Sequence, residues 1–332
     1  MAQRRLRFSR PRSRLGAVQL LFLGAALVLA FLSLLRGLSL HSSEERDAAT
    51  CPRVVKARAS LDWGAAREWD RRSALYDGMV RNVLRDGITL VSRAGGTQGM
   101  APETLFDRDE AQLVPRLRLL SVPVRAIVVP LLAAQSAASM VERTTRAALL
   151  PVLSGLGVWL QDPAAYHMSL FHASHHLAPV AATPAEVDDE ARVVQGILNS
   201  TCAIRAVLER VVVTRGGVVM AVWNVVAGGQ PASVRAALRA ALPSAPKQLV
   251  SDAPILHMTL ARVVALPQAG AAPLLAAVAA MSRMLCGMEA SFDAVWYAEE
   301  KHALALALRG DYAVRTLPMK QCTRSGRSLE QG

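Results

Sequence analysis

Aromatic and charged side chains are both scarce in this sequence of 332 residues, at 5% and 19%, whereas hydrophobic residues make up 52%. So little charge and so much apolar content exclude a wholly disordered chain. The shortage of aromatic residues predicts a core made mainly of aliphatic side chains. The mean hydropathy is +0.27, which is high for a purely soluble protein and indicates a membrane segment.

Cysteine is also rare, and no two of the four cysteines have CxxC spacing: Cys51, Cys202, Cys286 and Cys322. This pattern excludes a zinc ribbon and a small scaffold held together by many disulfides. Two disulfides, in any of three pairings, and free core thiols are both compatible with the sequence.

Acidic residues are absent from the first 36 positions, which hold seven arginines. The formal net charge is +12, and beyond the N-terminus 31 basic residues face 26 acidic ones, a net of +5. Because a protein that binds duplex nucleic acid usually has a dense basic stripe, we expect no duplex DNA partner.

Residues 15–35 (LGAVQLLFLGAALVLAFLSLL) predict a transmembrane anchor, because 21 residues without charge match the hydrocarbon core of a bilayer, roughly 30 Å thick. Six arginines precede this run and acidic residues follow it. Basic flanks stay cytoplasmic, so residues 1–14 are expected to form a cytoplasmic tail and the rest of the chain to be lumenal. A cleaved signal peptide and an organelle transit peptide are the alternatives.

The expected location is therefore an endomembrane, the endoplasmic reticulum or Golgi, with a single type II span that contacts the lipid bilayer through residues 15–35. The sequon at Asn199-Ser200-Thr201 agrees with this topology, since N-glycosylation takes place on the lumenal side. All four cysteines also lie beyond the anchor, where an oxidising lumen would permit disulfides.

Residues 41–115 are charged and interrupted by glycine and proline, which predicts a stem or irregular region with one helix near residues 63–84. A folded domain is expected over residues 117–320, followed by a flexible tail at 321–332. Its predicted strands are residues 122–129, 166–171, 204–214, 218–226, 256–264, 292–297 and 303–309. Its predicted helices are residues 139–153, 183–198, 231–242 and 273–285.

An internal repeat organises these elements. A strand, a helix and a second strand occur over residues 122–171 and again over 218–264, and each second strand carries nearly the same string, HMSL at 167–170 and HMTL at 257–260. We therefore predict an α+β fold of two duplicated lobes, residues 117–214 and 217–320. Antiparallel sheets would line a central cleft and helices would lie outside.

The repeated string has a direct chemical interpretation. Residues two apart on a strand point to one face, so His167 projects with Ser169, and His257 projects with Thr259. One neutral imidazole can accept a proton from water while the other, protonated, gives a proton to a leaving oxygen. The two hydroxyls can hydrogen-bond phosphate oxygens. This scheme needs no metal and no cofactor.

The triplet His-x-Ser/Thr occurs four times in the sequence. The copy at His41 lies just after the anchor, outside any predicted strand. The copy at His172 lies at the end of the first motif strand, and strict alternation places it on the face opposite to His167. The repeated HM[ST]L string inside matched strands is therefore the informative signal.

These motifs resemble those of the two-histidine phosphoesterase superfamily, which includes RNA ligase/cyclic nucleotide phosphodiesterase-like proteins. The stretches WLQDPAAYHMSLFHASHH (159–176) and ILHMTLARV (255–263) are similar to a membrane-anchored plant and algal branch. The resemblance covers about residues 120–310. It implies a bilobal α+β fold and action on 2′,3′-cyclic phosphates or related phosphodiesters, with His167 and His257 as the acid/base pair and Ser169 and Thr259 as phosphate ligands.

Other candidates are weaker. Tyr166 and Arg262 are expected substrate contacts, with Trp159 and Trp223 as further stacking candidates and core residence as the alternative for all three aromatics. The cluster of His172, His175 and His176 lacks a Cys or Asp at ligand spacing, so we expect a polar cleft rim and no metal. Asp107-Arg108-Asp109 matches the DxD of anchored glycosyltransferases but does not follow an apolar strand.

The sequence therefore predicts a hydrolase, a metal-independent phosphodiesterase acting on a small nucleotide or RNA-end phosphodiester. A membrane-tethered binding protein that keeps the fold without turnover is the first alternative. A type II glycosyltransferase is the second.

Overall fold

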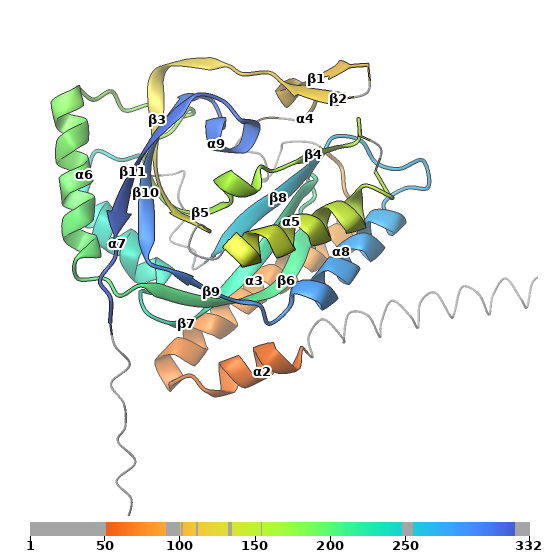
Figure 1. Ribbon diagram of the computed structural model, residues 1–332, viewed down its shortest axis with the longest axis horizontal. Coiled ribbons are helices and arrows are strands. Elements are labelled where there is room, and N and C mark those ends of the chain that lie inside the picture. The colour runs from red at the N-terminus through yellow and green to blue at the C-terminus, as the bar shows by residue number, and fades with distance from the viewer. Residues whose placement is uncertain are drawn as a thin grey trace, which may run out of the picture. The chain divides into compact units, whose positions relative to one another are not determined.

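The computed structural model describes residues 51–90, 100, 102–110, 112–131, 135–153, 155–247 and 255–322 (Figure 1). The predicted cytoplasmic tail, the anchor at 15–35 and nearly all of the tail at 321–332 lie outside the described residues. Within the described part, no helix combines the length and apolar character needed to cross a bilayer. The chain divides into two units, Met1–Ala49 and Thr50–Gly332, and all of the described residues belong to the second.

The second unit is a mixed α+β structure with antiparallel sheets, in agreement with the predicted class. One sheet has the strand order β11-β10-β3-β5, a second has the order β4-β8-β7-β6-β9, and β1 pairs with β2 in a small hairpin. The strands are β1 (Phe106–Asp109), β2 (Gln112–Pro115), β3 (Leu119–Pro130), β4 (Val158–Leu160), β5 (His167–Ser174), β6 (Ile204–Val213), β7 (Val218–Ala227), β8 (His257–Val263), β9 (Glu289–Phe292), β10 (Ala294–His302) and β11 (Tyr312–Pro318).

Helices pack against these sheets, and their starts follow local sequence signals. The helices are α2 (Pro52–Ala59), α3 (Trp63–Asp86), α4 (Pro102–Leu105), α5 (Gln135–Leu149), the 3-10 turn η1 (Pro163–Ala165), α6 (Pro184–Leu198), α7 (Pro231–Ala241), α8 (Ala272–Leu285) and α9 (Ala305–Leu308). Thr183 and Glu186 form the predicted capping box of α6, in which each side chain accepts a backbone N–H of the other residue. The four helices predicted for residues 117–320 are confirmed as α5, α6, α7 and α8, with ends shifted by up to four residues.

The internal repeat is present in the topology. β3, α5 and β5 form one unit in which the two strands pair antiparallel, and β7, α7 and β8 form a second unit with the same pairing. Ser169 lies opposite Val128 in the first unit, and Thr259 lies opposite Met220 in the second. Each motif strand thus pairs with the first strand of its own unit, although β5 is an edge strand and β8 lies between β4 and β7.

The predicted lobe boundaries are wrong, because the two sheets exchange strands. β6, expected in the lobe 117–214, pairs with β7 in the second sheet, and β4 joins the same sheet through β8. β10 and β11, expected in the lobe 217–320, complete the first sheet by pairing with β3 and with each other. A chain can add a strand to any sheet edge that it reaches, so sequence order does not define the lobes.

Residues 41–115 were expected to form a stem, yet α3 of that region is part of the folded unit. Trp69 and Tyr76 of α3 are buried, and Tyr76 packs with Val212, Met220 and Val222 on one face of the second sheet. The helix itself was predicted near residues 63–84 and is confirmed. The domain therefore begins near residue 51 instead of at residue 117.

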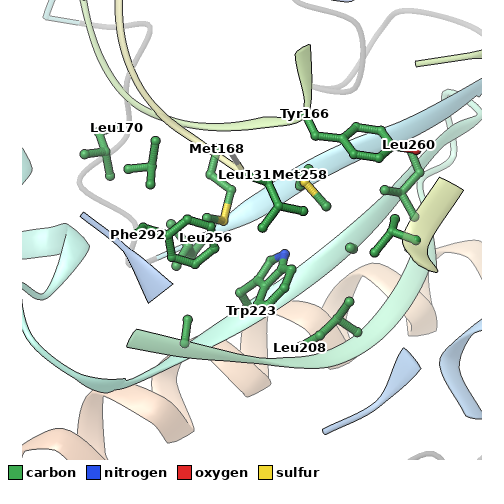
Figure 2. Packing of buried hydrophobic residues seen from close by; sticks show 14 of the residues in the cluster. Leu131, Tyr166, Met168, Leu170, Leu208, Trp223, Leu256, Met258, Leu260 and Phe292 are labelled. Atoms are coloured by element: carbon green, nitrogen blue, oxygen red, sulfur yellow. The ribbon is translucent and has the colours of Figure 1, made fainter. Parts of the chain in front are cut away.

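One continuous hydrophobic core connects the two sheets. Met168 and Leu170 of β5 and Met258 and Leu260 of β8 are all at most 1% exposed and belong to this cluster. Figure 2 shows Met168 and Met258 close to the indole of Trp223. Trp223 contacts Phe292 edge-to-face, with ring centroids 5.7 Å apart. Burial of these intervening residues fixes which face of each motif strand is turned away from the core.

All four cysteines are paired in this structure. Cys51, the residue before α2, is bonded to Cys286 at the end of α8, and Cys202 is bonded to Cys322. The sequence left three pairings and free thiols open, and the structure selects one pairing. A disulfide that closes a long loop typically stabilises a domain by about 2–4 kcal/mol.

Candidate active site

A small cavity of about 50 Å³ lies where the two motif strands approach each other. β5 is the edge strand of the first sheet, and it lies beside β8 of the second sheet without pairing with it. The cavity is lined by side chains of both sheets and of the α9 segment: Ala126, Val128, Gln161, His167, Ser169, His172, His257, Thr259, Arg262, Glu300, Leu304, Leu306 and Ala307. The two predicted imidazole–hydroxyl pairs are thus brought to one cavity.

Strand alternation explains why the histidine and the hydroxyl residue of each motif face the cavity. His167 and Ser169 face the cavity, whereas Met168 between them is buried in the core. β8 repeats the arrangement with His257, Thr259 and the buried Met258. The prediction that each motif presents an imidazole and a hydroxyl side by side on one face is confirmed.

A β-bulge then reverses the alternation in both strands. In β5 the register with β3 shifts between the pairs Ser169↔Val128 and Phe171↔Ile127, and in β8 the register with β7 shifts between Thr259↔Met220 and Ala261↔Val219. Leu170 and Leu260 are the extra residues. The expectation that His172 faces away from His167 is therefore wrong, because strict alternation does not continue through a bulge.

His167 has a defined hydrogen-bond partner. Its Nδ1 lies 2.8 Å from the carbonyl oxygen of Ala165, so Nδ1 carries the hydrogen and Nε2 is left for the cavity. Burial lowers the pKa of His167 below its usual value, the Ala165 carbonyl acts in the opposite direction, and the charge of Arg262 lowers the pKa further. The neutral imidazole can accept a proton at Nε2, and the imidazolium can donate one there.

His257 lies among cationic groups. Burial lowers its pKa to about 4, and the charges of Arg235, His167 and Arg262 act in the same direction. Arg235 of α7 donates from Nε to the carbonyl of Leu170 and from Nη2 to the carbonyls of Ser169 and Ile255. This arginine therefore connects the two motif strands behind the cavity.

Arg262, a predicted substrate contact, also lines the cavity. It is 5% exposed, and its Nε and Nη1 atoms have no hydrogen-bond partner among the described residues. Burial lowers its pKa to about 10, which still leaves the guanidinium charged at neutral pH. A buried cation with unpartnered N–H groups is suited to binding an anion.

Tyr166, the other predicted substrate contact, does not reach the cavity. It is 2% exposed and packs in the main core, where Figure 2 shows it near Leu260. Trp223 is also in the core, and the indole N–H of Trp159 donates to the carbonyl of Ala307. None of the three aromatic side chains considered for stacking lines the cavity.

The remaining sequence candidates lie elsewhere. Asn199 is exposed at the end of α6, where an oligosaccharide can reach it. Asp107 forms an ion pair with Arg116 at 2.5 Å on the β1–β2 hairpin, outside the cavity. The rings of His172 and His175 meet edge-to-face with centroids 5.1 Å apart. Among the described residues, no group of three His, Cys, Asp or Glu side chains is arranged to hold a metal ion.

Three parts of the site were not found from the sequence. Residues 303–309 were predicted to be a strand but contain α9. Leu304, Leu306 and Ala307 of this segment line the cavity, and we call the segment the α9 roof. Gln161 donates to the carbonyl of Leu306, and a carboxyl oxygen of Glu300 accepts the Leu306 N–H. Burial raises the pKa of Glu300 to about 7. These residues carry no local motif, so nothing in the sequence marked them.

α3 contacts the backbone next to the second motif through Tyr76. The hydroxyl of Tyr76 accepts the N–H of Leu256 and lies 3.1 Å from the Leu256 carbonyl and 2.9 Å from that of Trp223. Leu256 directly precedes His257, so this helix holds the backbone at the start of the motif strand.

No family model matches the chain, and no curated protein is similar to it. Among solved structures, the crystal structure of TT0787 of Thermus thermophilus is similar over 60% of this chain and 99% of that chain, with 17% identity and a TM-score of 0.39. Similarity at this level assigns neither the family nor the function of this chain.

Proposed function

We propose that this protein is a metal-independent phosphodiesterase of the two-histidine type, acting on 2′,3′-cyclic phosphates or related nucleotide and RNA-end phosphodiesters. The observation that carries the proposal is the meeting of two His-x-Ser/Thr faces, from equivalent strands of a duplicated unit, at one cavity. The resemblance of both motifs to that superfamily points in the same direction.

In the proposed reaction, a water oxygen attacks phosphorus while one imidazole accepts the water proton. One P–O bond breaks, and the second histidine, protonated, donates its proton to the leaving oxygen. His167 and His257 fill these two roles. The Ser169 and Thr259 hydroxyls and the Arg262 guanidinium bind the non-bridging oxygens as negative charge develops. Proton exchange with solvent then restores both histidines.

The size of the cavity indicates that only the phosphoryl group of the substrate is enclosed. A volume of about 50 Å³ is far below that of sites that enclose a drug-sized ligand, roughly 300–1,000 Å³. The sugar and base of a nucleotide would therefore lie outside the cavity or displace the α9 roof. We propose no cofactor, and the small-molecule substrate is the partner that the site fits.

The proposed location is the lumen of the endoplasmic reticulum or Golgi, with a type II anchor at residues 15–35. Two disulfides support an oxidising compartment, because such bonds are rare in the cytosol. The exposed position of Asn199 supports the same location.

The test is hydrolysis of 2′,3′-cyclic nucleotides by the purified lumenal unit, residues 50–332, in the presence of EDTA. His167→Ala and His257→Ala are each expected to lower kcat by at least about 100-fold, within the usual contribution of a general acid or base, with a melting temperature near that of the unchanged protein. His302→Gln, which removes a histidine outside the cavity, is the matched control and should keep full activity. Retention of turnover in both alanine variants would contradict the proposal.

A binding protein without turnover is the second candidate, and the small, roofed cavity is the observation that favours it. That protein would bind phosphate or a cyclic nucleotide in an Arg262-dependent manner and hydrolyse none of the substrates. A glycosyltransferase is not proposed, because neither Asp107 nor Asp109 of the β1–β2 hairpin lines the cavity.

A further inference from the structure

The two motif strands match at every cavity-facing position but one. β5 presents His167, Ser169 and His172, and β8 presents His257, Thr259 and Arg262. The bulges occur at the same step of both strands, so the fifth residue after each motif histidine faces the cavity. The pair His172 and Arg262 is therefore the chemical difference between the cavity-facing residues of the two motif strands.

Arg262 supplies an available positive charge on the β8 side. Its Nε and Nη1 atoms are buried and have no hydrogen-bond partner within the part of the chain that the structure describes. Glu300 contributes the one carboxyl group in the lining of the cavity, and that group accepts the Leu306 N–H and forms no ion pair with Arg262 in the described part of the chain. The nearby Arg235 donates to three backbone carbonyls instead. Arg262 is thus the cation placed to meet an incoming anion.

His172 is the residue of β5 that corresponds to Arg262, and its side chain carries no charge at neutral pH. It is 9% exposed, and no group in the described ranges of the chain forms a hydrogen bond with its Nδ1. Burial lowers its pKa to about 3, with smaller contributions in the same direction from His175, His167 and His176. The imidazole is therefore uncharged at neutral pH and can hydrogen-bond an alcohol oxygen or hydroxyl without attracting a phosphate.

We propose that Arg262 sets the orientation of the bound phosphodiester. The guanidinium binds the non-bridging oxygens, and the alcohol portion of the substrate points toward His172. Hydrolysis in this orientation forms one of the two regioisomeric products. This inference rests on the proposed function. In a cyclic phosphate either of two P–O bonds can break when water attacks. A ring held in one orientation always presents the same P–O bond in line with the attacking water, and the phosphate stays on the other sugar oxygen.

The first experiment identifies the product of 2′,3′-cyclic nucleotide hydrolysis by ³¹P NMR. The unchanged protein is expected to form a single regioisomer. Arg262→His, which gives β8 the same sequence of cavity-facing groups as β5, is expected to form both regioisomers and to raise KM at least 10-fold, with a smaller loss of kcat. A variant carrying both His172→Arg and Arg262→His should favour the opposite isomer. Melting temperatures check that each variant folds.

Two results would overturn the inference while leaving the hydrolase assignment intact: a mixture of regioisomers from the unchanged protein, or an unaltered single product and KM in Arg262→His. The control is Arg283→Gln, which removes an exposed arginine of α8 and should change neither quantity.

A second experiment separates this inference from the proposed function. Inorganic phosphate is titrated calorimetrically into the unchanged protein and into Arg262→Gln, and phosphate affinity is expected to fall at least 10-fold in the variant. If no phosphodiester is hydrolysed, the proposed function fails, and this titration still decides whether Arg262 binds the anion. Equal phosphate affinity in both proteins overturns the role of Arg262.

Discussion

At the residue scale, the environment of the two motif histidines determines how the site should respond to pH. Burial lowers the pKa of both side chains, to about 4 for His257 and to below its usual value for His167. The reference value for histidine is about 6.5. A mechanism with one neutral and one protonated imidazole is most active between the two pKa values.

The plot of kcat/KM against pH is therefore expected to be bell-shaped with its maximum below pH 6.5. Activity should fall as pH rises, because the acid histidine loses its proton, and should fall again near pH 4, because the base becomes protonated. The measurement is kcat/KM for a cyclic nucleotide from pH 3.5 to 8, with melting temperatures at each pH as the control for unfolding. A maximum above pH 7 would show that the histidines keep ordinary or raised pKa values and contradict this prediction.

At the element scale, α3 belongs to the machinery that positions the site. Its Tyr76 hydroxyl accepts the N–H of Leu256, one residue before His257. The spacing of apolar residues predicted this helix but did not predict which element it packs against. An amphipathic pattern shows that a helix buries one face without showing what covers that face. Only the packing of Tyr76 against β7 revealed that the expected stem supports a motif strand.

Tyr76→Phe tests this support. The change leaves the buried Leu256 N–H without its partner, and such a loss costs about 1–3 kcal/mol. We expect the free energy of unfolding, measured by urea denaturation, to fall by that amount and kcat to fall as the start of β8 loosens around His257.

The matched control is Tyr312→Phe on β11, a strand that pairs with β10 and with neither motif strand. If Tyr76→Phe behaved like this control in both stability and kcat, α3 would have no role in positioning His257.

At the scale of the whole molecule, strands far apart in the sequence share each sheet, and two disulfides join distant parts of the second unit, Thr50–Gly332. Cys51–Cys286 joins the start of α2 to the end of α8, and Cys202–Cys322 holds the C-terminal end of the described chain. Both bonds and the exposed Asn199 fit a domain that matures in an oxidising lumen.

The whole chain, expressed in a cell with a secretory pathway, is therefore expected to carry an N-linked glycan on Asn199. Treatment with an endoglycosidase should increase gel mobility, and Asn199→Gln should abolish the shift. Ser200→Ala is the control, since it leaves the Asn-x-Thr sequon intact and should keep the shift. Full mobility of the unchanged protein before treatment would place the domain on the cytoplasmic side and contradict the proposed topology.

The sequence by itself determined the α+β class, the capped helix after Thr183, the repeated unit and the strands that carry His167, Ser169, His257 and Thr259. These features depend on local periodicity and on short motifs, which are properties of neighbouring residues. Their predicted catalytic roles remain to be tested.

Only the tertiary structure decided that His172 faces the cavity, that β10 and β11 complete the first sheet, and that α9 covers the site. A bulge depends on the register with a partner strand, and a roof depends on which distant segment reaches it. Both are set by contacts between residues far apart in the chain, which the local pattern of the sequence does not contain.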